Sequence, residues 1–294
     1  MLRFSLLVLA GTVAVAAPVP KAKSQLLVVT TDAKSGKSQL VLIDADGSNP
    51  KELTDTESNA SDPAWNPDGT QIAFSSDQGG GVWHVFVMDA DGTNGKQLTR
   101  DVCGARAPSW SPDGKRIAFC RQGPDGHAVE VMDTDGAREE LADPHDGWDP
   151  AFSPDGKSIA FASPREGDGY KLYRMNADGK KVTKLVDQGN DLGFASPAWS
   201  PDGKRIAFGH QVNKRNIELH VVDADGKNLT KLTDFGGMSV YPAWGPDGKR
   251  LAFVQYKVGG KAELILADAD GKNPKAILKD FTPAEGGRPS WRPK

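Results

Sequence analysis

A block with two acidic residues, the second followed directly by glycine, occurs five times along the chain, and a sixth copy has Asn in place of the first acid; paired carboxylates are candidate calcium ligands. The first residue of each copy is Asp in five cases and Asn in one: Asp44, Asp89, Asp133, Asn176, Asp223 and Asp268. An EF-hand loop has a third acidic position before its glycine and a glutamate six residues after it. Neither feature recurs here. We therefore interpret these blocks as hairpin turns in which glycine supplies the positive φ.

Histidines and serines are the other residues that could do chemistry. Only one of the five histidines, His145, lies just before a repeated Pro-x-aromatic block, in the segment His145-Asp146-Gly147-Trp148-Asp149. Catalytic zinc sites take three protein ligands, so a single histidine is a weak metal signal. The Gly-x-Ser-x-Gly elbow of a serine hydrolase is missing from the sequence. We expect no catalysis and no cofactor.

Two residues precede each repeated proline, and they differ from copy to copy. They are Ser61-Asp62, Arg106-Ala107, Trp148-Asp149, Ala195-Ser196, Val240-Tyr241 and Gly287-Arg288. Arginine and aromatic side chains are enriched in binding hot spots. We therefore predict a partner-binding site formed by these irregular positions and their neighbours: Asp62, Arg106, His145, Asp146, Trp148, Asp149, Phe194, Tyr241 and Arg288. Loops that are simply variable and polar are the plainer explanation.

An internal repeat determines which elements carry these residues. One block reads Pro-x-Trp-Ser-Pro-Asp-Gly followed by Ile-Ala-Phe, with some variation, and its copies start at Pro63, Pro108, Pro150, Pro197, Pro242 and Pro289. The Asp-x-Asp-Gly block alternates with it, and successive copies lie 43 to 47 residues apart. A four-stranded propeller blade has this length, about 40 to 50 residues. Six copies therefore predict six blades.

Each blade is expected to contain an inner Pro-x-Trp strand, an Ile-Ala-Phe strand, a third strand and a short outer strand. The sixth copy lacks its second strand, while residues 25–30 form an extra strand near the N-terminus. Pairing these two ends would complete the last blade and remove the open edges. The predicted fold is an all-β, six-bladed β-propeller of four-stranded blades over residues 24–294, closed by its N- and C-terminal strands.

The block Pro-x-Trp-Ser-Pro-Asp-Gly-Lys-x-Ile-Ala-Phe, paired with a Met-Asp-Ala-Asp-Gly turn, resembles the repeat of TolB-type propellers. Propeller domains of prolyl-oligopeptidase-like peptidases carry the same repeat. The resemblance implies a periplasmic protein that contacts lipoproteins or other envelope components. TolB proteins also carry an N-terminal α/β domain, for which the roughly eight residues between the expected cleavage site and the first strand leave no room.

The N-terminus resembles a secretory signal peptide. Arg3 precedes an apolar run, and Ala14-Val15-Ala16 is a cleavage site of the small-x-small type. The run is shorter than the about 20 residues of a membrane span. We therefore expect residues 1–16 to be removed and the protein to be exported to the periplasm or the extracellular space, as a monomer. Its formal net charge of −3 argues against a nucleic-acid partner.

The two cysteines, Cys103 and Cys120, flank one expected hairpin near its open end. An exported protein can oxidise such a pair, so a disulfide between them is one prediction and two free thiols are the other.

Two functions remain open from the sequence. The first is a non-catalytic protein that binds a protein or a cell-envelope component through one mouth of the propeller channel. The second is a propeller enzyme with a metal in the channel, acting on a sugar or lactone. The enzyme would need polar ligands on several inner strands, whereas those strands read Ala64-Trp65, Ser109-Trp110, Ala151-Phe152, Ala198-Trp199 and Ala243-Trp244. The binding protein is therefore favoured.

Overall fold

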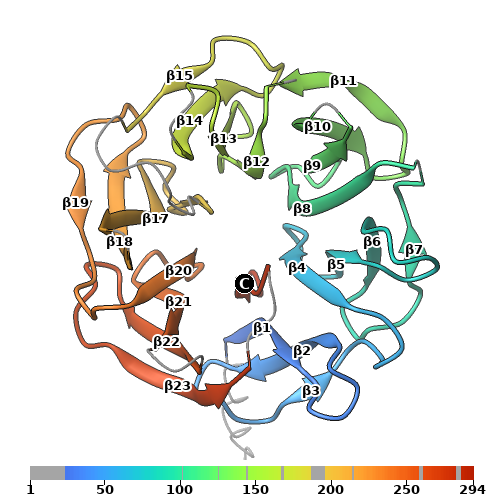
Figure 1. The fold of residues 1–294 in the computed structure, drawn as a ribbon, viewed down its shortest axis with the longest axis horizontal. Helices are drawn as coiled ribbons and strands as arrows, with labels where there is room; N and C mark the ends of the chain where they lie inside the picture. The colour runs from blue at the N-terminus through green and yellow to red at the C-terminus, as the bar shows by residue number, and fades with distance from the viewer. Residues whose placement is uncertain are drawn as a thin grey trace, which may run out of the picture.

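The computed structural model describes residues 24–100, 102–124, 126–143, 145–166, 169–186, 196–213, 215–257, 261–282 and 286–294. Over these residues the chain forms 24 β-strands. Figure 1 shows them in groups around a central axis, with the first strand of most groups nearest the axis. No helix in the described part of the chain is long and apolar enough to span a membrane. The expected signal peptide, residues 1–16, lies outside the described residues.

Three antiparallel sheets of four strands follow one another along the chain. The first contains β4 (Ala60–Trp65), β5 (Gln71–Ser76), β6 (His84–Asp89) and β7 (Lys96–Gln97). The second contains β8 (Gly104–Trp110), β9 (Arg116–Gly123), β10 (Gly126–Asp133) and β11 (Arg138–Asp143). The third contains β12 (Trp148–Phe152), β13 (Ser158–Ser163), β14 (Lys171–Asn176) and β15 (Thr183–Lys184).

The next eight strands form two antiparallel groups of four. One contains β16 (Ala198–Trp199), β17 (Arg205–Asn213), β18 (Asn216–Asp223) and β19 (Thr230–Lys231). The other contains β20 (Met238–Trp244), β21 (Arg250–Tyr256), β22 (Ala262–Asp268) and β23 (Lys275–Phe281). A single parallel pair, Ile217 with Met238, joins the two groups into one eight-stranded sheet.

The two ends of the chain share the remaining sheet, whose strand order is β24–β1–β2–β3. Its members are β24 (Ser290–Trp291), β1 (Gln25–Thr31), β2 (Ser38–Asp44) and β3 (Lys51–Glu52). Leu26 pairs with Trp291, and the Arg292 N–H donates a hydrogen bond to the Gln25 carbonyl at 2.9 Å. The innermost strand of this sheet therefore comes from the end of the chain. The all-β propeller with four-stranded antiparallel sheets that the repeat predicts is confirmed.

Tryptophan side chains connect neighbouring sheets. The indole N–H of Trp110 donates to the Ala64 carbonyl at 3.1 Å, and that of Trp244 donates to Ala198 at 3.1 Å. In each case the acceptor lies on the inner strand of the preceding sheet. Around these rings, the Ile and Phe of the repeat pack against side chains of the adjacent sheet in the hydrophobic core. Tryptophan suits this position because a large apolar ring carries one donor that needs a partner when buried.

The glycine of the Asp-x-Asp-Gly turn packs directly against the sheet before it. Gly271 has φ +82°, and a Cβ added there would lie 2.2 Å from the carbonyl oxygen of Leu232. Glycine is therefore required here for both its backbone conformation and its lack of a side chain.

Candidate functional site: a pocket at the channel mouth

The inner strands are bent at the residue before their proline. Five of these residues have left-handed backbone conformations with φ between 35° and 56°: Asp62, Ala107, Asp149, Ser196 and Tyr241. In β4, β8, β12 and β20 the pairing register with the second strand shifts at this point. Such β-bulges re-aim side chains and are over-represented next to functional sites. Strained conformations of this kind persist only where the surrounding structure holds them.

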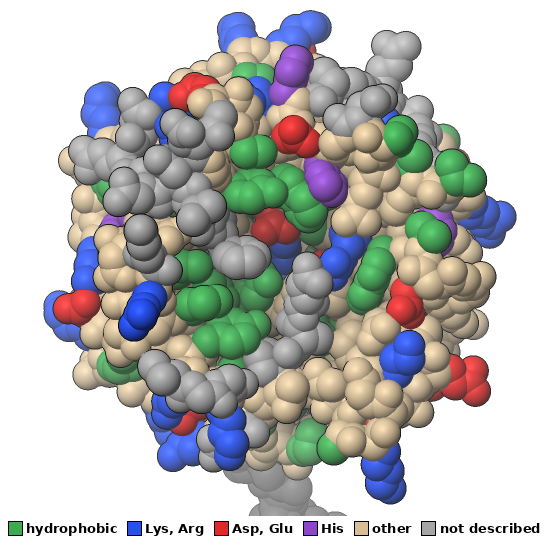
Figure 2. All heavy atoms as spheres, viewed as in Figure 1, with side chains coloured by type: hydrophobic (Ala, Val, Ile, Leu, Met, Phe, Trp, Pro, Cys, Tyr) green, Lys and Arg blue, Asp and Glu red, His purple; other side chains and the backbone are tan. Residues whose placement is uncertain are grey.

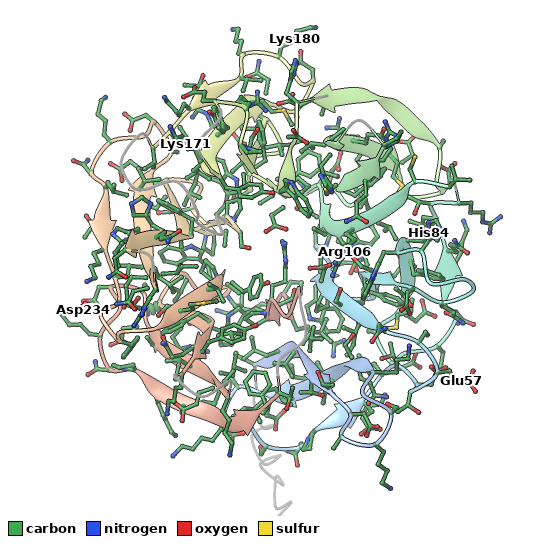
Figure 3. All side chains as sticks on the ribbon, viewed as in Figure 1. Glu57, His84, Arg106, Lys171, Lys180 and Asp234 are labelled. Carbon is green, nitrogen blue, oxygen red and sulfur yellow. The ribbon has the colours of Figure 1, made fainter. Side chains whose placement is uncertain are left out.

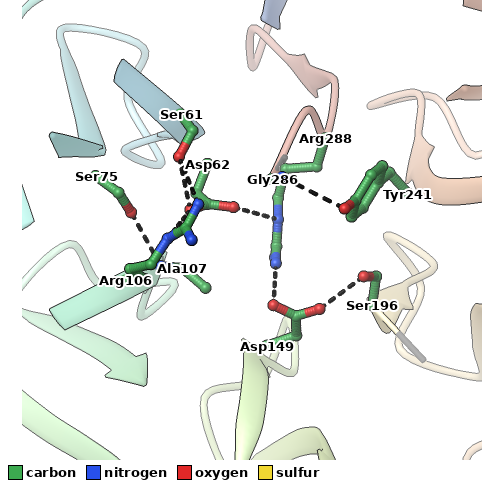
Figure 4. A network of polar contacts seen from close by, with 10 residues as sticks. All are labelled: Ser61, Asp62, Ser75, Arg106, Ala107, Asp149, Ser196, Tyr241, Gly286 and Arg288. Atoms are coloured by element: carbon green, nitrogen blue, oxygen red, sulfur yellow. Dashed lines mark hydrogen bonds and ion pairs between the residues drawn. The ribbon is translucent and has the colours of Figure 1, made fainter. Parts of the chain in front are cut away.

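Two acids and two arginines alternate across the channel at the level of these bulges (Figure 4). Arg288 Nη2 lies 2.6 Å from Asp149 Oδ1, and Arg288 Nε lies 3.7 Å from Asp62 Oδ1. Arg106 Nε lies 3.6 Å from the other oxygen of Asp62, Oδ2. The four side chains come from the three inner strands β4, β8 and β12 and from Arg288, two residues before β24. They therefore link sheets that are far apart in the sequence.

Hydroxyl groups complete this network. The Ser61 hydroxyl donates to Asp62 Oδ2 at 3.0 Å, and the Ser196 hydroxyl donates to Asp149 Oδ2 at 2.6 Å. Tyr241 Oη accepts a hydrogen bond from the Gly286 N–H at 3.3 Å. The network is consequently held in one arrangement by bonds from several sheets.

Burial sets the electrostatics of the network. The Asp62 side chain is only 4% exposed, and its burial raises the pKa of the carboxyl group against the opposing effect of Arg288 and Arg106. Burial disfavours the charged form of Arg288, but the carboxylates of Asp149 and Asp62 outweigh it and raise the pKa of the guanidinium. Removing one partner from such a buried pair leaves an uncompensated charge, which is strongly destabilising.

Aromatic rings form the wall above this charged floor. The Trp148 and His127 ring centroids lie 3.8 Å apart, and Tyr170 meets Trp148 edge-on at 6.1 Å. The Arg106 guanidinium stacks on the Trp83 ring at 4.2 Å. Together with the charged floor, this wall encloses a cavity of about 230 Å³ lined by Asp62, Arg106, Ala107, Cys120, Trp148, Asp149, Ala162, Tyr170, Tyr241 and Gly286. We call this cavity the mouth pocket.

The surface views place the mouth pocket at the centre of one face. Figure 2 shows a hollow at the axis, where hydrophobic side chains surround basic and acidic groups. In Figure 3 the Arg106 side chain lies beside the central opening, whereas Glu57, His84 and Asp234 lie toward the rim. An apolar wall with a few fixed polar groups is the usual composition of a ligand site.

The structure brings together six of the nine predicted binding residues: Asp62, Arg106, Trp148, Asp149, Tyr241 and Arg288. His145 and Asp146 lie beside the pocket and are not among its lining residues. The His145 side chain is 71% exposed, and its Nδ1 lies 3.1 Å from Asp143 Oδ1. Asp146 accepts a hydrogen bond from the His127 N–H at 2.8 Å. Phe194 lies outside the described residues.

Several residues of the site escaped the sequence analysis. Tyr170 lies in the connection between the second and third strands of its sheet, just before β14, and His127 is the second residue of the third strand β10. Ser196 occupies one of the irregular positions before a proline, a signal that could have identified it. Gly286 lines the pocket through its backbone, for which a sequence gives no signal.

The two cysteines are free, which is the second of the two alternatives that the sequence left open. Cys120 pairs with Arg106 across β8 and β9, and Gly104 pairs with Gln122. Cys103 therefore lies three positions along the hairpin from the residue opposite Cys120, too far for a disulfide, which needs Cα atoms within about 7 Å. Cys120 lies in the mouth pocket instead, where burial raises the pKa of its thiol above the ordinary value.

Within the described ranges, no group of three or more His, Cys, Asp or Glu side chains is arranged to hold a metal ion. The two acids in the mouth pocket are each paired with an arginine instead.

Comparison with known proteins gives a family match and similar folds. The model of the TolB β-propeller domain matches residues 9–142 and 82–211. TolB from Acinetobacter baumannii has a TM-score of 0.73 and 25% identity, covering 92% of this chain and 67% of that one. A candidate TolB from Agrobacterium tumefaciens has a TM-score of 0.71 and 19% identity, covering 92% and 97% of the two chains.

A curated relative is similar over a shorter stretch. Dipeptidyl-peptidase 5 of Porphyromonas gingivalis is 42% identical over 66 residues, which are 21% of this chain and 10% of the peptidase. The matched stretch thus spans only a tenth of that enzyme's length.

Proposed function

Because the chain belongs to the TolB β-propeller family, we propose that it is a non-catalytic binding protein that takes a protein or cell-envelope partner at the mouth pocket. The propeller that carries this site has six blades, and the β24–β1 pair closes the ring. In support, the described strands divide into six four-stranded groups, and Leu26 pairs with Trp291.

One observation carries the binding proposal. The mouth pocket combines a wall of aromatic rings, Trp148 and Tyr170, with a floor of ion pairs fixed by hydrogen bonds from several sheets. Aromatic anchors and desolvated charged groups at the centre of a concave surface are the usual features of an interface hot spot. The floor is rigid before a partner arrives, which lowers the entropic cost of binding.

The state of the reactive groups in the pocket favours binding over catalysis. Burial raises the pKa of the Cys120 thiol and of the Tyr241 hydroxyl, so both stay protonated at neutral pH. A thiol is a poor nucleophile in that state, because the thiolate is the reactive form. Asp62 and Asp149 both contact Arg288, so their carboxylates are engaged in ion pairs.

The proposed location follows from the N-terminal leader. Residues 1–16 have the charge, apolar run and cleavage site of a secretory signal peptide. The similarity to TolB proteins supports the periplasm as the compartment. The proposal is therefore that the mature protein meets its partner in the cell envelope.

A capture experiment tests this proposal. The mature protein would be cross-linked in envelope extract, and captured proteins would be identified by mass spectrometry with wild type, Trp148→Ala and Phe235→Ala. Phe235 is an exposed aromatic outside the pocket lining, so Phe235→Ala is the matched control. We expect one partner to be captured by wild type and by the control, and lost from Trp148→Ala. Equal capture by all three proteins would place the binding site elsewhere.

A further inference from the structure

A second site follows from a break in the repeat on the face that carries the turns. The first residue of each second strand pairs with the last residue of the third strand. These six equivalent positions are Gln25, Gln71, Arg116, Ser158, Arg205 and Arg250. The facing residue is aspartate in five of the six four-stranded groups, whereas in the third sheet Ser158 faces Asn176. The third sheet therefore has neither the arginine nor the aspartate that other copies carry at these two facing positions.

Where the position is arginine, the guanidinium covers the inner aromatic ring of the next sheet. Arg205 stacks on Trp244 with the guanidinium carbon 4.9 Å from the ring centroid, and Arg250 stacks on Trp291 at 4.9 Å. Arg116 lies over Phe152 at 5.6 Å. Three of the six copies thus place an arginine on the ring face at this point, and the Ser158 copy lies between the first of them and the other two.

Ser158 is too short to reach the ring that follows it, Trp199. Among the described residues, no arginine or lysine stacks on Trp199. Trp199 is only half-buried, whereas the equivalent Trp65, Trp110, Trp244 and Trp291 are buried. Beside it lies a cavity of about 380 Å³ lined by Ser153, Pro154, Asp155, Ser158, Arg174, Trp199, Pro201, Asp202, Gly203 and Ala224. We call this cavity the Trp199 slot.

Fixed groups border the slot. The Trp199 indole N–H donates to the Ala151 carbonyl at 3.0 Å, which fixes the ring plane. Asp155 and Asp202 lie on the turns of the two flanking sheets. Oδ1 of each accepts a hydrogen bond from a serine hydroxyl at 2.6 Å. Those hydroxyls lower the pKa of both carboxyl groups, so both are charged at neutral pH. The one cation in the lining, Arg174, donates Nη1 to the Ala224 carbonyl at 2.6 Å.

We propose that the Trp199 slot binds the guanidinium of an arginine side chain presented by a protein partner. A planar guanidinium stacks on an indole and forms paired hydrogen bonds with carboxylates, which an ammonium group does less well. The lining of the slot contains this ring, two carboxylates and one arginine, so its negative charges outnumber its positive charge. In the neighbouring repeats an arginine of the chain itself stacks on the equivalent tryptophan. The partner's arginine thus supplies the side chain that the repeat lacks at Ser158.

Indole NMR signals can test this proposal directly. The protein would be labelled with ¹⁵N-tryptophan, and the Trp199 signal would be assigned with a Trp199→Phe variant. Nα-acetyl-arginine amide is the probe, and Nα-acetyl-citrulline amide, which has the same shape without the charge, is its control. We expect the arginine compound to shift the Trp199 signal with a dissociation constant in the millimolar range and the citrulline compound to bind at least about tenfold more weakly. Equal shifts with both compounds, or none with arginine, would overturn the proposal.

A repeat-restoring variant gives an independent test. Ser158→Arg places an arginine from the chain itself over Trp199, so we expect it to fold and to weaken arginine-amide binding by at least about tenfold. Gln71→Arg is the matched control, because it makes the equivalent change before Trp110, which is already buried. Unchanged binding to folded Ser158→Arg would refute the slot. This readout is independent of the mouth pocket, since Trp148→Ala should leave it unaltered.

Discussion

Left-handed backbone conformations occur both on the face that carries the repeated turns, which we call the turn face, and at the channel mouth. The two regions use different types of residue for them. On the turn face they fall mostly on residues that tolerate positive φ, such as Gly114, Gly271 and Asn228, with Lys181 as an exception. At the mouth they fall on residues such as Ala107 and Tyr241, which adopt such conformations only with strain. The turn face is therefore specified by its local sequence, whereas the mouth is held by packing and by a polar network. Changes on the two faces should have different effects.

The largest effect is expected from removing the arginine of the mouth network. Arg288→Met leaves Asp62 and Asp149 without their shared cation, and breaking such a buried pair costs about 3–5 kcal/mol of unfolding free energy. Urea unfolding measures this loss. Lys272→Met is the turn-face counterpart, because it removes an exposed ion pair with Asp270, and its unfolding midpoint should match wild type. Equal losses in the two variants would contradict the idea that the mouth depends on its network.

A smaller loss, about 3 kcal/mol, is expected from Gly271→Ala on the turn face. The added methyl group would meet the Leu232 carbonyl of the preceding sheet at 2.2 Å, on top of the strain of a positive φ. Gly36→Ala isolates the strain, because φ is +68° there and nothing lies within 4 Å of an added Cβ. That control should lose about 1–2 kcal/mol. If both variants lose the same amount, the contact between sheets is looser than the structure indicates.

Acid should weaken the turn face. Serine hydroxyls in the Ser-Pro-Asp-Gly turns lower the pKa of Asp113, Asp155 and Asp202 in the folded protein. A lowered folded pKa gives stability that is present above the unfolded value of 3.8 and is lost as pH falls through the folded value. The urea midpoint should therefore begin to drop below about pH 5 and continue to drop as the pH passes 3.8 and falls through the lower folded pKa values. The triple Asp→Asn variant should show a shallower drop, and an identical pH profile would exclude these carboxylates as the cause.

The smallest effects come from exchanging residue types between the faces. Gly114→Ala adds strain at φ +69° with only an ordinary contact to Pro67, so we expect a loss of about 1–2 kcal/mol. Ala107→Gly relieves similar strain at φ 56° but removes a buried methyl group, and its stability should stay within about 0.5 kcal/mol of wild type. Thermal unfolding of both variants measures the difference. A large loss in Ala107→Gly would show that its bulge is unstrained.

The fold was predictable because the repeat encodes it locally. Each Ser-Pro-Asp-Gly turn, each Ile-Ala-Phe strand and the spacing of the copies are visible in the sequence, and the strand pairings follow from them. The candidate site was predictable where it breaks the repeat, as at Arg106, Trp148 and Tyr241. Such positions stand out because the other copies show what the fold alone requires.

The rest of the site depends on long-range packing. Tyr170 reaches Trp148 through a connection between strands whose path the sequence does not determine. His145 lies just before an inner strand in the sequence, but its ring nitrogen Nδ1 contacts the buried carboxylate of Asp143. The Trp199 slot arises from the shortness of Ser158, a feature visible only when the six four-stranded groups are aligned by their registers.

The sheet shared by β24 and β1 has a consequence for how the molecule assembles. Its innermost strand cannot join until residues from opposite ends of the chain meet, and contacts of such long sequence separation form slowly. Until then β1 presents an open edge, which the β24 segment of a second molecule could occupy equally well. Refolding at high protein concentration should therefore trap swapped dimers that do not form in dilute solution.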